Sequence, residues 1–197
     1  MSYLLPRAAL ERYLSPALLF LDRVGVRPDH VSLLGAAGNV LAGVLAGRGE
    51  LLGAGLAAWG FSALDAVDGP LARATGRQTR FGSVLDAVLD RVSEAAVLGG
   101  LAFLFLRHGD QEGALLAFVA AVASFLVSYV RARAEVVGIP LREGLLARPE
   151  RVFILGLGLI INEVKVVLWV LAVAASLTAA HRLFLAHRRT RQEEEEA

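Results

Sequence analysis

Residues 65–90 read DAVDGPLARATGRQTRFGSVLDAVLD and carry four aspartates around a short polar segment. Asp65 and Asp68 are three residues apart, and Asp86 and Asp90 are four apart. Both spacings place the two side chains of a pair on one face of an α-helix. Since apolar residues precede the first pair and follow the second, the sequence predicts a helical hairpin on which the four carboxylates converge.

The rest of the chain is unusually apolar. Its hydrophobic share is 56% over 197 residues, above the roughly 45–50% of soluble domains. About 20 mostly apolar residues cross the hydrocarbon core of a bilayer. We therefore expect an all-α integral membrane protein, with residues 1–197 forming a single domain of six transmembrane helices. The six expected spans are residues 31–47, 51–69, 84–106, 113–133, 149–162 and 164–186.

The two ends of the chain are expected to flank this six-helix membrane core of residues 31–186. Residues 3–24 interleave leucines with charged side chains, a pattern typical of an amphipathic helix lying in the membrane interface. Residues 1–30 should therefore form an N-terminal juxtamembrane helix and a turn. Residues 187–197 contain four consecutive glutamates and are expected to be a solvated cytoplasmic tail without regular structure.

The positive charges predict how the chain is oriented. Sixteen Lys and Arg residues fall in residues 1–30, 70–83 and 131–151 and in the C-terminal end, against three on the opposite side. Positive residues mark cytoplasmic loops. We therefore expect a multi-pass protein of the cell membrane, with both termini and the aspartates facing the cytoplasm.

Several classes of function are excluded or disfavoured by composition. The net charge of +1 gives no electrostatic argument for binding nucleic acid. The absence of Cys excludes disulfides, thiolate zinc sites and cysteine nucleophiles. The four His residues include no H-x-x-x-H pair, which disfavours a histidine-rich zinc hydrolase.

The four aspartates need compensation inside a membrane. Facing lipid, they would cost on the order of 10 kcal/mol in total. Carboxylates at matched spacing suit small hard cations such as Mg²⁺ or Mn²⁺, and two such ions would clamp both sides of a phosphoryl transfer. The structural alternative is that neighbouring arginines compensate the charges: Arg73, Arg77, Arg80 and Arg91.

The segment between the pairs is suited to a phosphate ligand. Gly69 gives the backbone room for close approach, and Arg73 can donate two hydrogen bonds to phosphate oxygens. Gly82 lies one turn before Asp86 and permits close packing. Each residue alone is weak evidence, since a glycine at a helix end is often a cap.

The complete pattern resembles the signature of the CDP-alcohol phosphotransferase family, with every position filled. It reads D-x2-D-G-x2-A-R-x8-G-x3-D-x3-D, from Asp65 to Asp90. The resemblance implies six transmembrane helices, a homodimer, two divalent metals (Mg²⁺ or Mn²⁺) and an active site open to the cytoplasm. It also implies displacement of CMP from a CDP-linked lipid, either CDP-diacylglycerol or an archaeal CDP-lipid, by an alcohol.

The resemblance also assigns roles to individual residues. Asp65, Asp68 and Asp86 would bind metal, and Asp90 would both bind metal and accept the proton of the attacking hydroxyl. The residues expected to contact the CDP-lipid are Gly69, Arg73, Thr79 and the upstream run Asp29, His30, Val31 and Ser32. For the upstream run the alternative is that Asp29 or Ser32 caps the first span.

The acceptor alcohol has to be recognised elsewhere. Two segments, SYVRARAE at residues 128–135 and RPER at residues 148–151, resemble the branch of the family that makes phosphatidylinositol phosphate from inositol 1-phosphate. Several arginines in one pocket suit an acceptor that carries a phosphate. The residues expected to bind it are Ser128, Arg131, Arg133, Arg148 and Arg151.

Other interpretations remain open from the sequence. The arginines are also explained by positive charges flanking spans, and glycerol 3-phosphate, giving phosphatidylglycerophosphate, is a second acceptor with a phosphate. Facing carboxylates could form a cation or proton pathway in a transporter. A purely structural hairpin is also possible, and small residues such as Gly43 and Gly47 fit packing in a dimer under either interpretation.

Overall fold

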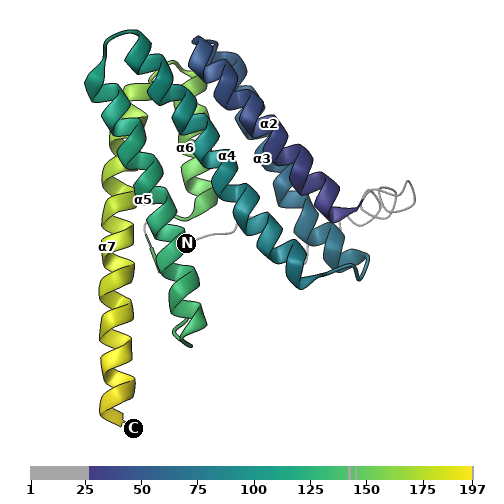
Figure 1. The fold of residues 1–197 in the computed structure, drawn as a ribbon, viewed down its shortest axis with the longest axis vertical. Coiled ribbons are helices and arrows are strands. Elements are labelled where there is room, and N and C mark those ends of the chain that lie inside the picture. The colour runs from purple at the N-terminus through teal and green to yellow at the C-terminus, as the bar shows by residue number, and fades with distance from the viewer. Residues whose placement is uncertain (1–26, 142, 145, 197) are drawn as a thin grey trace.

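The computed structural model describes residues 27–141, 143–144 and 146–196, which are helical with short connections (Figure 1). The juxtamembrane helix predicted over residues 3–24 lies outside this range. Five of the six predicted spans fall within one helix each, and the fifth, predicted over residues 149–162, extends two residues past the end of its helix at Ile160. The helices are α2 (Pro28–Arg48), α3 (Leu51–Ala74), α4 (Arg80–Arg107), α5 (Gln111–Val136), α6 (Arg148–Ile160) and α7 (Val164–Glu196).

Three of the described helices are long and apolar enough to cross a membrane: α2, α5 and residues 164–192 of α7. The other three differ for reasons visible in the sequence. Helices α3 and α4 carry the aspartate pairs, and α6 has only 13 residues. At about 1.5 Å per residue, α6 is shorter than the roughly 30 Å of a bilayer core.

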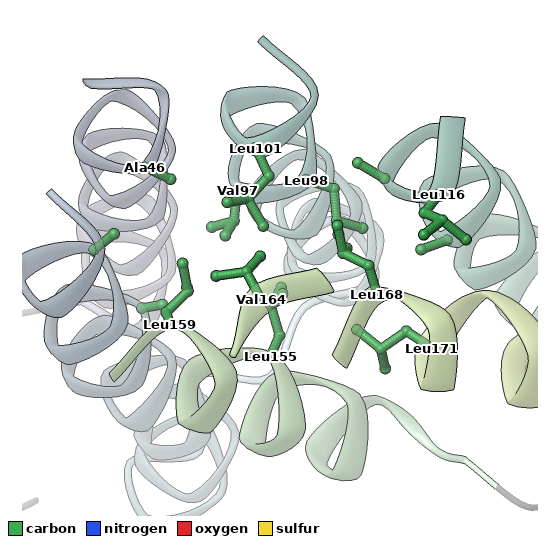
Figure 2. Packing of buried hydrophobic residues seen from close by; sticks show 14 of the residues in the cluster. Ala46, Val97, Leu98, Leu101, Leu116, Leu155, Leu159, Val164, Leu168 and Leu171 are labelled. Carbon is green, nitrogen blue, oxygen red and sulfur yellow. The ribbon is translucent and has the colours of Figure 1, made fainter. Parts of the chain in front are cut away.

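The helices pack in two groups joined by α4 and α6. Helix α2 packs on α3 and α4, α5 packs on α7, and α6 lies between α3 and α7 (Figure 1). Leucines from α4, α6 and α7, including Leu98, Leu155 and Leu168, meet in the centre of the core (Figure 2). Large apolar side chains are also exposed on the outside, as at Leu34, Phe118 and Leu183, which fits a surface solvated by lipid.

Small residues bring α2 and α4 into close contact within the chain. A Cβ atom on Gly43 would overlap the backbone of Ala96, and one on Gly100 would overlap the backbone of Gly43. Gly43 thus packs against α4 of the same chain, and its role in packing a dimer stays a prediction.

The expectation of an irregular C-terminal tail is wrong, because α7 continues through it to Glu196. Arg191 Nε lies 2.8 Å from Oε1 of Glu195, which is one helical turn ahead. Such pairs support a solvated helix. Arg189 also anchors this part of α7 by donating a hydrogen bond of 2.6 Å to the Pro140 carbonyl.

Candidate active site

The four aspartates lie at one end of the bundle, where α3 ends and α4 begins. Asp65 and Asp68 are buried, with exposed fractions of 8% and 9%, whereas Asp86 and Asp90 are partly exposed. Asp65 lies close enough to Asp68 and Asp86 for their charges to interact, and the same holds for Asp86 with Asp90. The predicted convergence of the two pairs is thus present in the structure.

Two residues of α2 shape the surroundings of the first pair. Ser32 Oγ donates a hydrogen bond to Asp68 Oδ2. Gly35 leaves the space that Asp65 occupies, because a Cβ atom there would overlap the Asp65 carboxylate. Neither Asp29 nor Ser32 caps α2, since the helix begins after Arg27 with no side-chain cap. The capping alternative for these two residues is therefore wrong.

Arg148, the first residue of α6, lies among the carboxylates. Its Nη2 is 3.0 Å from Asp65 Oδ2, and its Nη1 is 2.8 Å from Asp90 Oδ1. It thereby links α6 to both α3 and α4. The sequence suggested other arginines as partners for the aspartate charges. Of these, Arg91 lies 3.7 Å from Asp90, a longer contact than either ion pair of Arg148.

The residues at this position fit divalent cations. Asp65 Oδ1 is buried without a hydrogen-bond partner, so one oxygen of a buried carboxylate is left to accept a ligand. A cationic group, the Arg148 guanidinium, already bridges two of the carboxylates. In this arrangement no three acidic or histidine side chains of the described residues are close enough to hold an ion.

A cavity of about 370 Å³ opens on one side of the carboxylates and is here named the Asp86 cavity. Five of the residues predicted to contact the CDP-lipid line it, together with two of the aspartates. These lining residues are Asp29, Ser32, Gly69, Arg73, Thr79, Asp68 and Asp86. Thr79 has a structural role as well, because its hydroxyl accepts a 2.8 Å hydrogen bond from the Gly82 N–H and caps α4.

A second cavity of about 300 Å³ opens on the other side and is named the Asp90 cavity. Four of the residues predicted to bind the acceptor line it, with Asp90 at its wall: Ser128, Arg131, Arg148 and Arg151. The two aspartates of α4 thus face different cavities one helical turn apart. The carboxylate cluster therefore borders both the Asp86 cavity and the Asp90 cavity.

Four predicted site residues line neither cavity: Asp65, which is buried beside Arg148, and His30, Val31 and Arg133. His30 and Arg133 are exposed, and Val31 is buried. His30 and Val31 are on α2 beside residues that do line the Asp86 cavity, and Arg133 projects from α5 away from Arg131.

Sequence reasoning missed Arg182 of α7, which lines the Asp90 cavity. This residue is 4% exposed, and it donates hydrogen bonds to the carbonyls of Val127, at 2.7 Å, and Glu143, at 2.8 Å. Its signal was a charged residue following the apolar run of the last span, but it was counted among the positive charges of the cytoplasmic end.

Comparisons with known proteins agree on one family. Residues 26–186 match the family model described as CDP-alcohol phosphatidyltransferase. The chain is 38% identical to the phosphatidylinositol phosphate synthase of Mycobacteroides abscessus, over 93% of this chain and 87% of that protein. It is 37% identical to the protein of that name from Streptomyces avermitilis, over 92% of this chain and 81% of the relative.

Solved structures give the same result. The crystal structure of Mycobacterium tuberculosis phosphatidylinositol phosphate synthase with CDP-DAG bound superposes with a TM-score of 0.82 at 34% identity, covering 89% of this chain and 94% of that one. The structure of the same protein in complex with manganese and citrate also gives 0.82, at 35% identity, covering 87% and 88%.

Proposed function

The chain belongs to the CDP-alcohol phosphatidyltransferase family, and from this premise we propose that it transfers a phosphatidyl or archaetidyl group from a CDP-linked lipid to inositol 1-phosphate, releasing CMP. The observation that carries the proposal is the pair of cavities on opposite sides of the aspartates. One is lined by the family signature and the other by five arginines: Arg91, Arg131, Arg148, Arg151 and Arg182.

In this proposal the Asp86 cavity binds the CDP-lipid. Arg73 pairs with phosphate oxygens. Because Gly69 has no side chain, the diphosphate can approach the end of α3 closely. Asp65, Asp68, Asp86 and Asp90 would hold two Mg²⁺ or Mn²⁺ ions. When bound, these ions neutralise the diphosphate and make CMP a better leaving group.

The Asp90 cavity binds the acceptor. Its arginines neutralise the phosphate of inositol 1-phosphate, and Ser128 and Arg131 orient the inositol ring toward Asp90. The acceptor oxygen then bonds to the lipid-linked phosphorus as the bond from that phosphorus to CMP breaks. Asp90 accepts the hydroxyl proton late in this step, since a carboxylate that also binds metal is a weak base.

We further propose that the single domain of residues 1–197 crosses the cell membrane six times and acts as a homodimer. The asymmetry of Lys and Arg supports an active site and termini on the cytoplasmic face. That side also suits the acceptor, because a charged sugar phosphate reaches the site from water.

The test is CMP release by the purified protein with CDP-diacylglycerol and Mg²⁺ or Mn²⁺. Four acceptors are compared: inositol 1-phosphate, free inositol, glycerol 3-phosphate and serine. Inositol 1-phosphate should give the highest kcat/KM, and EDTA should abolish the activity. A preference for glycerol 3-phosphate would assign the chain to phosphatidylglycerophosphate synthesis, and a preference for free inositol would also refute the proposed acceptor.

A further inference from the structure

We propose that Arg148 alternates between two partners, so that binding of divalent cations and binding of the phosphorylated acceptor favour each other. In the first position, which the structure shows, Arg148 bridges Asp65 and Asp90. With cations bound to the carboxylates, Arg148 turns into the Asp90 cavity and pairs with the acceptor phosphate. This inference rests on the proposed function and deepens it.

The first position is defined by charge and contact. Arg148 makes ion pairs of 3.0 Å with Asp65 and 2.8 Å with Asp90. Its positive charge interacts with all four aspartates, including Asp68 and Asp86, which it does not touch. The guanidinium therefore provides the positive charge that a cluster of four carboxylates requires.

The bridge is incomplete on both sides. Asp65 Oδ1 and Arg148 Nε are both buried, and neither has a hydrogen-bond partner. Unpaired buried polar atoms are unfavourable, and the ion pairs between Arg148 and the aspartates leave these two atoms without a partner. A cation would satisfy the carboxylate oxygen, and a phosphate oxygen would satisfy the guanidinium N–H.

The second position is already adjacent. Arg148 is the first residue of α6 and lines the Asp90 cavity, and 27% of its side chain is exposed. A rotation of its side chain carries the guanidinium toward Arg131 and Arg182 without moving the helix. Those arginines repel it while the cavity holds no anion. An acceptor phosphate removes that repulsion and provides the bidentate partner that a guanidinium prefers.

Such a coupling has to be reciprocal. If the acceptor phosphate draws Arg148 away from the aspartates, the acceptor raises cation affinity, and cations raise acceptor affinity by the same factor. Removal of the Arg148 charge should have two effects on cation binding. It frees the carboxylates for cations in the absence of acceptor, and it abolishes the effect of the acceptor on cation affinity.

The experiment measures Mn²⁺ affinity of the purified full-length chain from the free Mn²⁺ signal in electron paramagnetic resonance, without CDP-lipid. In the parent protein, saturating inositol 1-phosphate should tighten Mn²⁺ binding at least about fivefold. In Arg148→Gln, Mn²⁺ should bind at least about fivefold more tightly without acceptor, and the acceptor should add less than about twofold. The matched control is Arg131→Gln, which lines the same cavity but pairs with Glu135 at 2.9 Å. Its Mn²⁺ affinity without acceptor should equal that of the parent.

Unchanged or weaker Mn²⁺ binding in Arg148→Gln would overturn the inference, as would an acceptor effect that persists in this variant. If Arg148→Gln does not fold, Arg148→Met serves instead, because methionine also removes the positive charge and keeps a long unbranched side chain. The same two results decide with that variant. Glycerol 3-phosphate and inorganic phosphate are run in parallel, so an error in the acceptor identity changes which ligand is effective and leaves the acceptor-free result for Arg148→Gln intact.

Discussion

Arg151 forms a two-pronged ion pair with Glu94, with Nε 2.8 Å from Oε1 and Nη2 3.0 Å from Oε2. Only 2% of the Arg151 side chain and 12% of the Glu94 side chain are exposed. Arg151 also donates a 3.3 Å hydrogen bond to the Leu146 carbonyl. This pair joins α4 to α6 beneath the Asp90 cavity and fixes the start of α6.

Loss of one partner of this pair should be strongly destabilising. Arg151→Met leaves the Glu94 carboxylate buried and unpaired, and we expect the free energy of unfolding to fall by about 3–5 kcal/mol. The thermal unfolding midpoint in detergent measures the effect. The double variant Arg151→Met, Glu94→Leu should recover most of the loss. The control is Arg191→Ala, whose pair with Glu195 is exposed by 72% and 63%, and which should leave the midpoint unchanged.

Gly35→Ala should disturb Asp65 without altering any ligand. The added methyl group overlaps the Asp65 carboxylate, and changes to groups that support a metal ligand typically lower metal affinity or activity by about 10–100-fold. We expect that loss in Mn²⁺ affinity and in kcat. Gly60→Ala, on α3 with no atom near the new methyl group, is the matched control. Equal behaviour of the two variants would mean that the position of Asp65 is not critical.

Asp90→Asn tests the proposed base. The amide keeps the shape of the side chain but accepts no proton, so kcat should fall by about 10²–10⁴-fold. Mn²⁺ affinity is measured in parallel, because Asp90 is also a proposed metal ligand and the loss of an ion would lower activity as well. Full turnover by Asp90→Asn with intact Mn²⁺ binding would remove the proposed role of Asp90 as a base.

Arg182 and Arg133 should differ sharply in acceptor binding. Arg182 lines the Asp90 cavity, whereas Arg133 does not. A hydrogen bond to a charged group contributes about 1.5–3 kcal/mol, so Arg182→Gln should raise the KM for inositol 1-phosphate by about 10–100-fold. Arg133→Gln should leave this KM within about twofold of the parent value. A larger effect of Arg133→Gln would restore the original assignment of Arg133 to the acceptor site.

The sequence was most informative where function depends on spacing along one helix or hairpin. The pairs Asp65–Asp68 and Asp86–Asp90 could be placed on facing helices because periodicity alone fixes their faces. The family and the helical fold follow from the same stretch and from the apolar runs, and both are confirmed.

Contacts between distant segments could not be derived in the same way. Arg148 is 83 residues from Asp65, and periodicity carries no information about their ion pair. Arg182 was misjudged for the same reason, since a positive charge at the end of a span serves topology as readily as a binding site. The helical tail was missed because a run of glutamates disfavours a helix locally, while the contact of Arg189 with Pro140 comes from tertiary packing.

The C-terminal part of α7 holds the segment that leads into the acceptor site. Arg182 and Arg189 grip the segment between α5 and α6 at Glu143 and Pro140, just before the chain enters α6 at Arg148. A truncation after residue 186 would remove Arg189 and loosen that segment, although the deleted residues touch neither cavity. A change at the carboxyl terminus is thus connected to acceptor recognition through Arg189 and the segment it holds.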